Sequence, residues 1–163
     1  MEIAPLVVEM TETPFEVREP LLADHERLES LFQQVISAFE AGSREDVDAI
    51  WSRFDRELLE HMEAEERCLV PWLFRADQRA ARSIIQEHRL IQSRLVELGE
   101  SVDLHTIRLD VARTFIDELR AHAKHEDRVL YSWADEHVPE EDRRSLLGSL
   151  IERAKLWLAA IAP

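Results

Sequence analysis

Two stretches of the chain share a spacing of residues that can bind a metal ion: a histidine followed four positions later by a glutamate. After each glutamate, both stretches carry an acidic residue, an arginine, a leucine and a tryptophan at equal offsets. A lone histidine lies upstream of each stretch. Imidazole and carboxylate groups repeated in this way form a ligand set for metal ions, which a hydrophobic core does not need. The candidate metal ligands are therefore His25, His61, Glu65, His88, His122 and Glu126.

Long amphipathic helices must position these side chains. Apolar residues recur at helical spacing, and glycine is scarce, with 3 residues in the chain. On each of the first four expected helices, a candidate histidine occupies a place on the apolar stripe. Short connections between such helices favour an all-α fold, an antiparallel up-down-up-down four-helix bundle with a fifth, C-terminal helix. The expected helices cover about residues 20–41, 44–69, 77–99 and 106–136, and the fifth begins at Pro139.

Capping residues and prolines predict where these helices begin and end. The segment that starts at Ser43 resembles a capping box, and Asp77 is the expected N-cap of the third helix, which Gly99 should end. Prolines break up the beginning of the chain. We therefore expect an extended N-terminal arm over residues 1–18, packed on a bundle domain over residues 19–163.

The composition of the chain excludes several classes of partner. A net charge of −14 argues against nucleic acid and anionic membrane surfaces, because both require a basic face. The single cysteine, Cys68, excludes an internal disulfide. No apolar run approaches the roughly 20 residues that span a bilayer, and the N-terminus lacks the basic start of a secretory signal. A cytoplasmic location is expected, whereas the sequence does not indicate an oligomeric state.

Glu65 and Glu126 provide the strongest argument for a metal. An ionised carboxylate buried without a partner costs several kcal/mol, and each of these residues lies on the inward face of its helix. Each also lies one turn after an imidazole, so that both groups can reach the same cluster. Imidazole together with bridging carboxylate suits iron or manganese better than structural zinc, and the preponderance of imidazole favours iron.

The order of these residues closely resembles that of the hemerythrin-like (HHE cation-binding) domain family. The resemblance covers about residues 20 to 137 and includes the residues that follow each carboxylate, from Glu66 to Trp72 and from Asp127 to Trp133. It implies two iron ions with a bridging oxo or hydroxo group inside a four-helix bundle, held by the candidate ligands named above.

Gln92 marks a departure from the oxygen-carrying members of this family, which have a further histidine one turn after the third-helix ligand, here His88. In the arrangement that the resemblance implies, four imidazoles and two bridging carboxylates give four bonds to each iron, and a bridging oxygen gives a fifth. Octahedral coordination then leaves one position open on each metal. An additional open position favours reactivity with peroxide or NO over simple reversible oxygen carriage.

Other residues near the candidate ligands are able to contribute. His125, Glu66 and Asp127 are possible additional ligands, but we expect them to contact the ligands from outside or to face water. Acidic residues that flank the ligands can orient an imidazole through its second nitrogen. Most acidic residues on such helices face water, and for that reason we leave the flanking ones outside the predicted site. The flanking residues are Asp24, Glu26 and Glu87.

The sequence favours a di-iron protein that binds or senses a small oxidant or diatomic ligand, namely oxygen, NO or peroxide. The main alternative is an enzyme with catalase-like, peroxidase-like or iron-centre-repair activity, although no general base, nucleophile or substrate pocket is evident beyond the metal. The repair members of the resembled family usually carry an N-terminal cysteine, and this arm has none. Iron storage or delivery and a metal-free interaction bundle are the remaining alternatives.

Overall fold

The computed structural model describes residues 15–161, apart from the side chains of residue 154 and residues 156–161. Within that range the secondary structure is entirely helical, as expected for an all-α fold. No helix among the described residues is apolar over a length that would cross a membrane. The elements are α1 (Arg18–Glu40), α2 (Arg44–Cys68), α3 (Val70–Ala76), α4 (Gln78–Asp103), α5 (Leu109–Glu126), the π-helical segment η1 (Asp127–Tyr131), α6 (Ser132–His137) and α7 (Glu140–Ile161).

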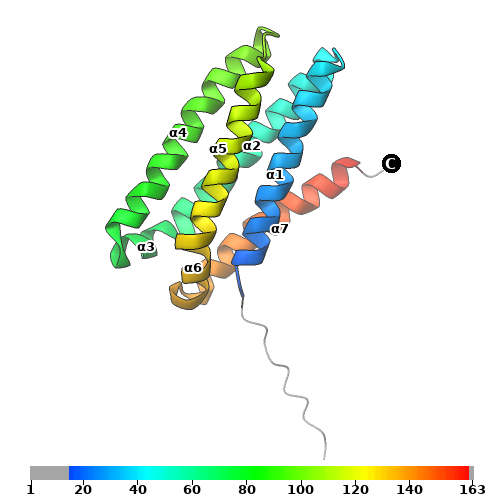
Figure 1. Cartoon of the computed structure of the whole chain (residues 1–163). Coiled ribbons are helices and arrows are strands. Elements are labelled where there is room, and N and C mark those ends of the chain that lie inside the picture. Colours follow the sequence, from blue (N-terminus) through cyan, green and yellow to red (C-terminus); the bar gives the residue numbers. More distant parts are fainter. Residues whose placement is uncertain (1–14, 162–163) are drawn as a thin grey trace, which may run out of the picture.

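Four long helices, α1, α2, α4 and α5, lie side by side as a helical bundle (Figure 1). Two apolar clusters fill it. The first includes Phe32, Phe54 and Phe115, whose ring centroids lie 4.9 Å (Phe32 to Phe54) and 5.2 Å (Phe32 to Phe115) apart. The second gathers around Leu21 and Tyr131. Along each of the four helices, the candidate ligands lie between residues of the first cluster and residues of the second.

The third predicted helix extends further than Gly99. Helix α4 continues to Asp103, so the predicted end was wrong. Gly99 therefore lies inside the helix, where a β-carbon would make an ordinary contact with the indole of Trp51 at 3.6 Å. The glycine that a backbone turn does require is Gly42, whose φ of 74° lies in the left-handed region after α1.

Helix starts agree with the sequence at one cap and differ at another. Asp77 caps α4, accepting hydrogen bonds from the backbone N–H groups of Arg79 and Ala80 at 3.0 Å. The Ser43 hydroxyl instead donates to the carboxylate of Asp46, so the predicted capping box does not form. The short helix α3 was not predicted, since a proline was expected only to stop α2, whereas it lies in the first turn of α3.

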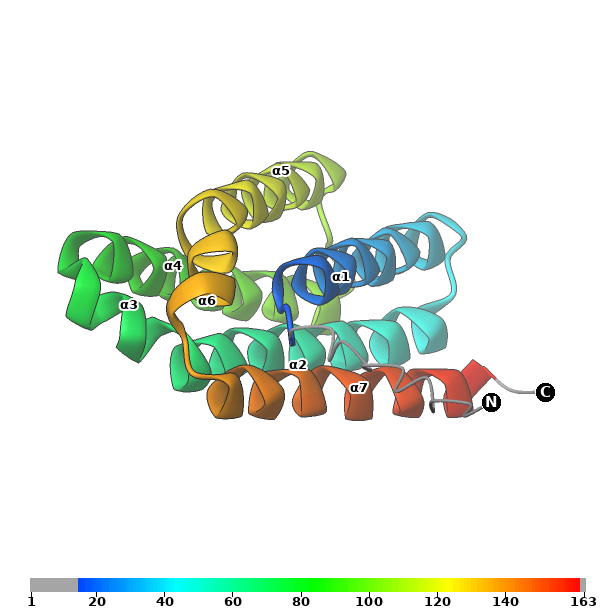
Figure 2. The same cartoon turned by 90° about the horizontal axis from the view of Figure 1, so that it is seen from below.

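The fourth predicted helix is one helical run, α5–η1–α6, from Leu109 to His137, with the π-helical segment inside it. Helix α7 follows and packs along α2, also touching α1 (Figure 2). The predicted arm, residues 1–18, lies mostly outside the described residues, and α1 begins at Arg18.

Candidate metal centre

The predicted ligands lie together at one level of the bundle. His25 comes from α1, whereas α2 and α5 each contribute a histidine and a glutamate, and α4 contributes His88. The ring centroids of His25 and His61 lie 4.5 Å apart, and those of His88 and His122 lie 5.0 Å apart. Both carboxylates are fully buried. The sequence repeat therefore brings two helix pairs to a single centre.

Glu126 lies at the middle of this centre. Its Oε2 is 3.3 Å from Nε2 of His25, and its Oε1 is 3.0 Å from Nε2 of His88 and 3.2 Å from Nε2 of His122. Glu65 is further from its neighbours, at 3.4 Å from Nε2 of His61 and 3.6 Å from Nε2 of His88. Atoms of five of the six predicted ligands gather into two groups, each within 4.8 Å; Glu126 belongs to both groups and Glu65 to neither.

Several of these atoms are buried without a hydrogen-bond partner among the residues that the structure describes. They are Nε2 of His25, His61 and His122 and Oε2 of Glu65. Buried polar atoms in folded proteins are nearly always paired, because leaving them unpaired costs free energy. Since imidazole nitrogen and carboxylate oxygen are ligands of iron, this set of unpaired nitrogen and oxygen atoms fits a metal centre.

A second layer of carboxylates fixes three of the four imidazoles. Nδ1 of His61 donates to Asp24 at 2.8 Å, Nδ1 of His88 to Glu66 at 2.8 Å, and Nδ1 of His122 to Glu87 at 2.9 Å. Such a bond selects the tautomer that leaves Nε2 free to bind a metal. Our expectation that Asp24 and Glu87 face water was wrong. Among the described residues, Nδ1 of His25 has no such partner.

The three possible additional ligands each have another partner. His125 donates through Nδ1 to Glu87 at 2.6 Å. Glu66 accepts from His88, as described above, and Asp127 accepts from the Arg18 guanidinium at 2.6 Å. Of the three, only Glu66 contacts a predicted ligand directly.

Tyr131 is a residue of the site that the sequence did not reveal. Its hydroxyl lies 2.6 Å from Oε1 of Glu65 and 2.8 Å from Oε2 of Glu126, and the ring is fully buried. The residue lies in η1, where the wider π-helical turn aligns positions five apart, so that Tyr131 points to the same side as Glu126. In the alignment of the two stretches it takes the place of Val70, and that exchange of valine for a buried hydroxyl was the available signal.

Charges within the centre shift its titration in the metal-free chain. Burial lowers the pKa of His61, but Glu65 and Asp24 outweigh it and raise that pKa to about 10. His122 behaves alike: burial lowers its pKa, while Glu126 and Glu87 raise it to about 10. Burial and the two nearby carboxylates raise the pKa of Tyr131 well above its usual value. Without metal, then, the buried carboxylates are balanced by protonated imidazoles.

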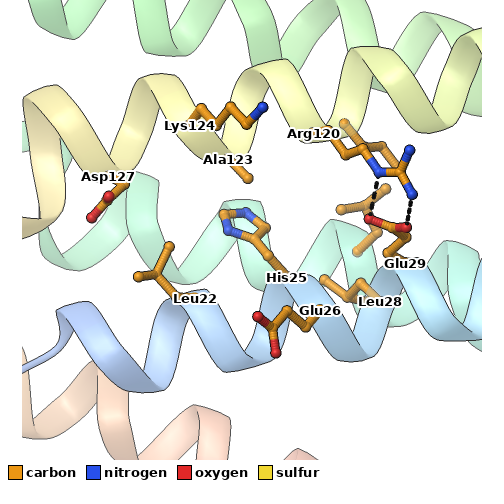
Figure 3. Close-up of a pocket in the computed structure, with 11 residues that line it drawn as sticks. Leu22, His25, Glu26, Leu28, Glu29, Arg120, Ala123, Lys124 and Asp127 are labelled. Atoms are coloured by element: carbon orange, nitrogen blue, oxygen red, sulfur yellow. Dashed lines mark hydrogen bonds and ion pairs between the residues drawn. The ribbon is translucent and has the colours of Figure 1, made fainter.

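A groove of about 450 Å³ between α1 and α5 reaches His25 (Figure 3). The apolar side chains of Leu22 and Leu28 line it, together with Ala123 and the Arg120–Glu29 ion pair. A smaller groove of about 240 Å³, between α4 and α5, reaches His122, and there Glu87 and His125 line the wall. Both grooves combine apolar and ionisable side chains, since Lys124 and Asp127 also line the first, and Leu90 and Ile91 also line the second.

Comparison with known proteins gives one match. The family model described as the hemerythrin HHE cation binding domain matches residues 17–134, a range that contains all of the predicted ligands. Neither the curated proteins nor the solved structures that were searched match the sequence.

Proposed function

Since this match covers most of its length, the chain belongs to the hemerythrin HHE cation-binding domain family, and we propose that it is a non-haem di-iron protein. Its function in this proposal is to bind or sense a small oxidant or diatomic ligand: oxygen, NO or peroxide. The observation that carries the proposal is the set of buried, unpaired Nε2 atoms facing two buried carboxylates. A pair of iron ions, with an oxo or hydroxo bridge, supplies redox-active positions for such a ligand.

The chain's own residues have three tasks in this proposal. The four imidazoles and Glu65 and Glu126 hold the metals from four helices, for which we infer the antiparallel up-down-up-down order. The outer carboxylates keep Nδ1 protonated in His61, His88 and His122, so that Nε2 of each would face the metal. Tyr131 holds both metal-facing carboxylates in place through its hydroxyl.

The nature of the approach supports a small ligand. The groove at His25 leads to a candidate ligand, and its volume of about 450 Å³ is ample for a diatomic molecule or peroxide. Gln92 stands where the oxygen carriers of the family have a further histidine, so the chain would supply one imidazole fewer and leave more room for such a ligand. A cytoplasmic location, where such ligands arise in metabolism, belongs to the same proposal.

Metal loading followed by ligand addition tests the proposal. The purified chain is titrated with Fe²⁺ without oxygen, and we expect two ions per chain, as in other di-iron bundles. Oxygen or NO is then admitted, and near-ultraviolet and visible absorption should change in wild type but not in His122→Ala. Absence of iron binding, or binding without a spectral response to oxygen, NO or peroxide, refutes the proposal. Sustained oxygen evolution from peroxide favours the catalase-like alternative, and uptake of many irons favours storage.

A further inference from the structure

A buried guanidinium of the C-terminal helix contacts Asp24, the carboxylate that accepts a hydrogen bond from His61. Arg153 of α7 is 7% exposed, although arginine is almost never fully buried without a partner. Its Nη2 donates to Oδ2 of Asp24 at 2.9 Å, and its Nη1 donates to the backbone carbonyl of Glu57 at 3.0 Å. Helix α7 lies wholly outside residues 17–134, the range of the family match. One partner of this contact therefore lies outside the matched part of the chain.

Arg153 and His61 donate to the same oxygen. Oδ2 of Asp24 accepts from Nδ1 of His61 at 2.8 Å as well as from Arg153. The other oxygen, Oδ1, accepts from Arg27 at 2.8 and 3.1 Å. Two guanidinium groups thus fix both oxygens of a carboxylate that is 7% exposed. The orientation of the His61 ring depends on this carboxylate, because it accepts the only hydrogen bond that Nδ1 can donate.

No comparable cation supports the other imidazoles within the described part of the chain. The carboxylates behind His88 and His122 belong to Glu66 and Glu87, whose side chains are 39% and 33% exposed. Neither is paired with an arginine among the described residues. Water can take part in holding Glu66 and Glu87, whereas Asp24 depends on the protein alone.

We propose that Arg153 is a positioning residue of the metal centre, which acts through Asp24 to fix the tautomer and orientation of His61. The C-terminal helix thereby sets the affinity of one half of the site, the half that contains His25 and His61. This inference rests on the proposed function, because it assumes that His61 binds a metal.

A double-mutant cycle tests the inference. Wild type, Arg153→Met, Asp24→Asn and the double variant are titrated with Fe²⁺ without oxygen, and with Co²⁺ while its visible ligand-field bands are recorded. Loss of an outer partner typically costs about 10–100-fold in metal affinity. We expect Arg153→Met to weaken one of the two ions by about tenfold and to alter its Co²⁺ bands, while the other ion is unchanged. Because Arg153 acts through Asp24, the double variant should bind no more weakly than Asp24→Asn alone.

Two further variants separate positioning from general stability. Arg144→Met removes an exposed arginine of α7 that pairs with Glu140, and it should bind both ions like wild type. Arg153→Lys keeps the charge and a single donor nitrogen, and it should recover part of the affinity. It replaces Arg153→Met in the cycle if circular dichroism shows that Arg153→Met does not fold. Normal affinity for both ions in the Arg153 variants, or effects that add fully to those of Asp24→Asn, overturns the inference. If wild type itself binds no metal, the proposed function fails instead.

Discussion

Behind the half of the metal centre formed by α1 and α2 lies a buried carboxylate that is paired with arginines. Behind the half formed by α4 and α5 lie partly exposed carboxylates. Asp24, behind His61, is enclosed by Arg27 and Arg153. Glu87, behind His122, is one third exposed and is shared with His125. In sequence the two halves are a repeat, with the same candidate ligands in the same order and the same spacing from histidine to glutamate. The repeat therefore predicts the candidate ligands, and the surroundings distinguish two halves that the repeat makes alike.

The backbone that follows the glutamate also differs between the two halves. After Glu65, helix α2 ends at Cys68, and α3 begins at Val70. After Glu126, the helix continues through η1 and brings Tyr131 against both carboxylates. In the first half the helix ends, and in the second it continues as a π-helical turn. Only the π-helical turn places a further polar group, the Tyr131 hydroxyl, in the site.

The largest expected effect comes from the residue that joins the halves. Glu126 belongs to both groups of ligand atoms, so Glu126→Gln should weaken both ions, by about 100-fold or more, since it removes a direct ligand rather than an outer one. Iron content after desalting, measured by metal analysis, should fall well below two per chain. Glu118→Gln, a partly exposed residue of α5 that pairs with Arg94, is the matched control. Retention of one tightly bound ion in Glu126→Gln contradicts a shared bridge.

A pair of outer variants measures the difference between the halves directly. Asp24→Asn should lower the affinity for one ion by about 100-fold, and Glu87→Gln should lower the affinity for the other by about tenfold, the two ends of the usual range for outer partners. The reason is that water can replace an exposed acceptor but not a buried one held by two guanidiniums. Competition with a chelator of known affinity gives both values. Equal losses in the two variants remove the distinction between the halves.

The ligand set was open to prediction because its signals are local. Each candidate histidine lies on an apolar helical stripe, and each glutamate follows a histidine by one turn, so that a period of 3.6 residues is sufficient to bring them to one face. The all-helical fold followed from the same periodicity. These inferences needed no knowledge of which helix packs against which.

The residues that escaped prediction depend on distance or on irregular backbone. Arg153 is 129 positions from Asp24, and no helical period relates the two. Tyr131 reaches Glu126 only because η1 is a π-helical segment; in a regular α-helix, position 130 rather than 131 lies over position 126. Gly99 was read as a helix end, although α4 continues through it to Asp103. Long-range packing placed Arg153, and an irregular turn placed Tyr131.

Tyr131→Phe makes the second half resemble the first, because Val70, at the matching position of the first half, has no hydroxyl. In the metal-free chain, this leaves two buried carboxylates without the O–H donor, and hydrogen bonds to charged groups contribute about 1.5–3 kcal/mol. We expect the free energy of unfolding to fall by about 2 kcal/mol, measured by urea denaturation. The loss should be smaller with metal bound, because the carboxylates then have other partners. An equal loss in both states contradicts that account.

The two approaches to the centre predict different routes for the ligand. Ala123→Trp fills the larger groove, at His25, and Ala121→Trp fills the smaller groove, at His122 on the opposite side of α5. We expect Ala123→Trp to slow NO binding by about tenfold, which corresponds to an added barrier of about 1.4 kcal/mol. Ala121→Trp should leave the rate near that of wild type. Stopped-flow absorbance of the iron-loaded chain gives both rates, and slowing by Ala121→Trp alone assigns entry to the other half.

The smallest expected effect concerns Glu57 and its partners Arg27 and Arg53, in the half formed by α1 and α2. Burial raises the pKa of Glu57, but Arg53 and Arg27 outweigh it, and the net result is a pKa below the usual value of 4.5. A carboxylate whose pKa is lower in the folded state stabilises the fold above its unfolded pKa, and this contribution is lost as the pH falls through the folded value. The metal-free chain should therefore lose stability below about pH 4.5, and less steeply in Glu57→Gln than in wild type. Urea denaturation from pH 7 to pH 3 measures both slopes, with Glu60→Gln, an exposed residue of α2, as the control. Identical slopes in wild type and Glu57→Gln mean that Arg27 and Arg53 do not stabilise this carboxylate. The difference between the two halves is then smaller than we infer.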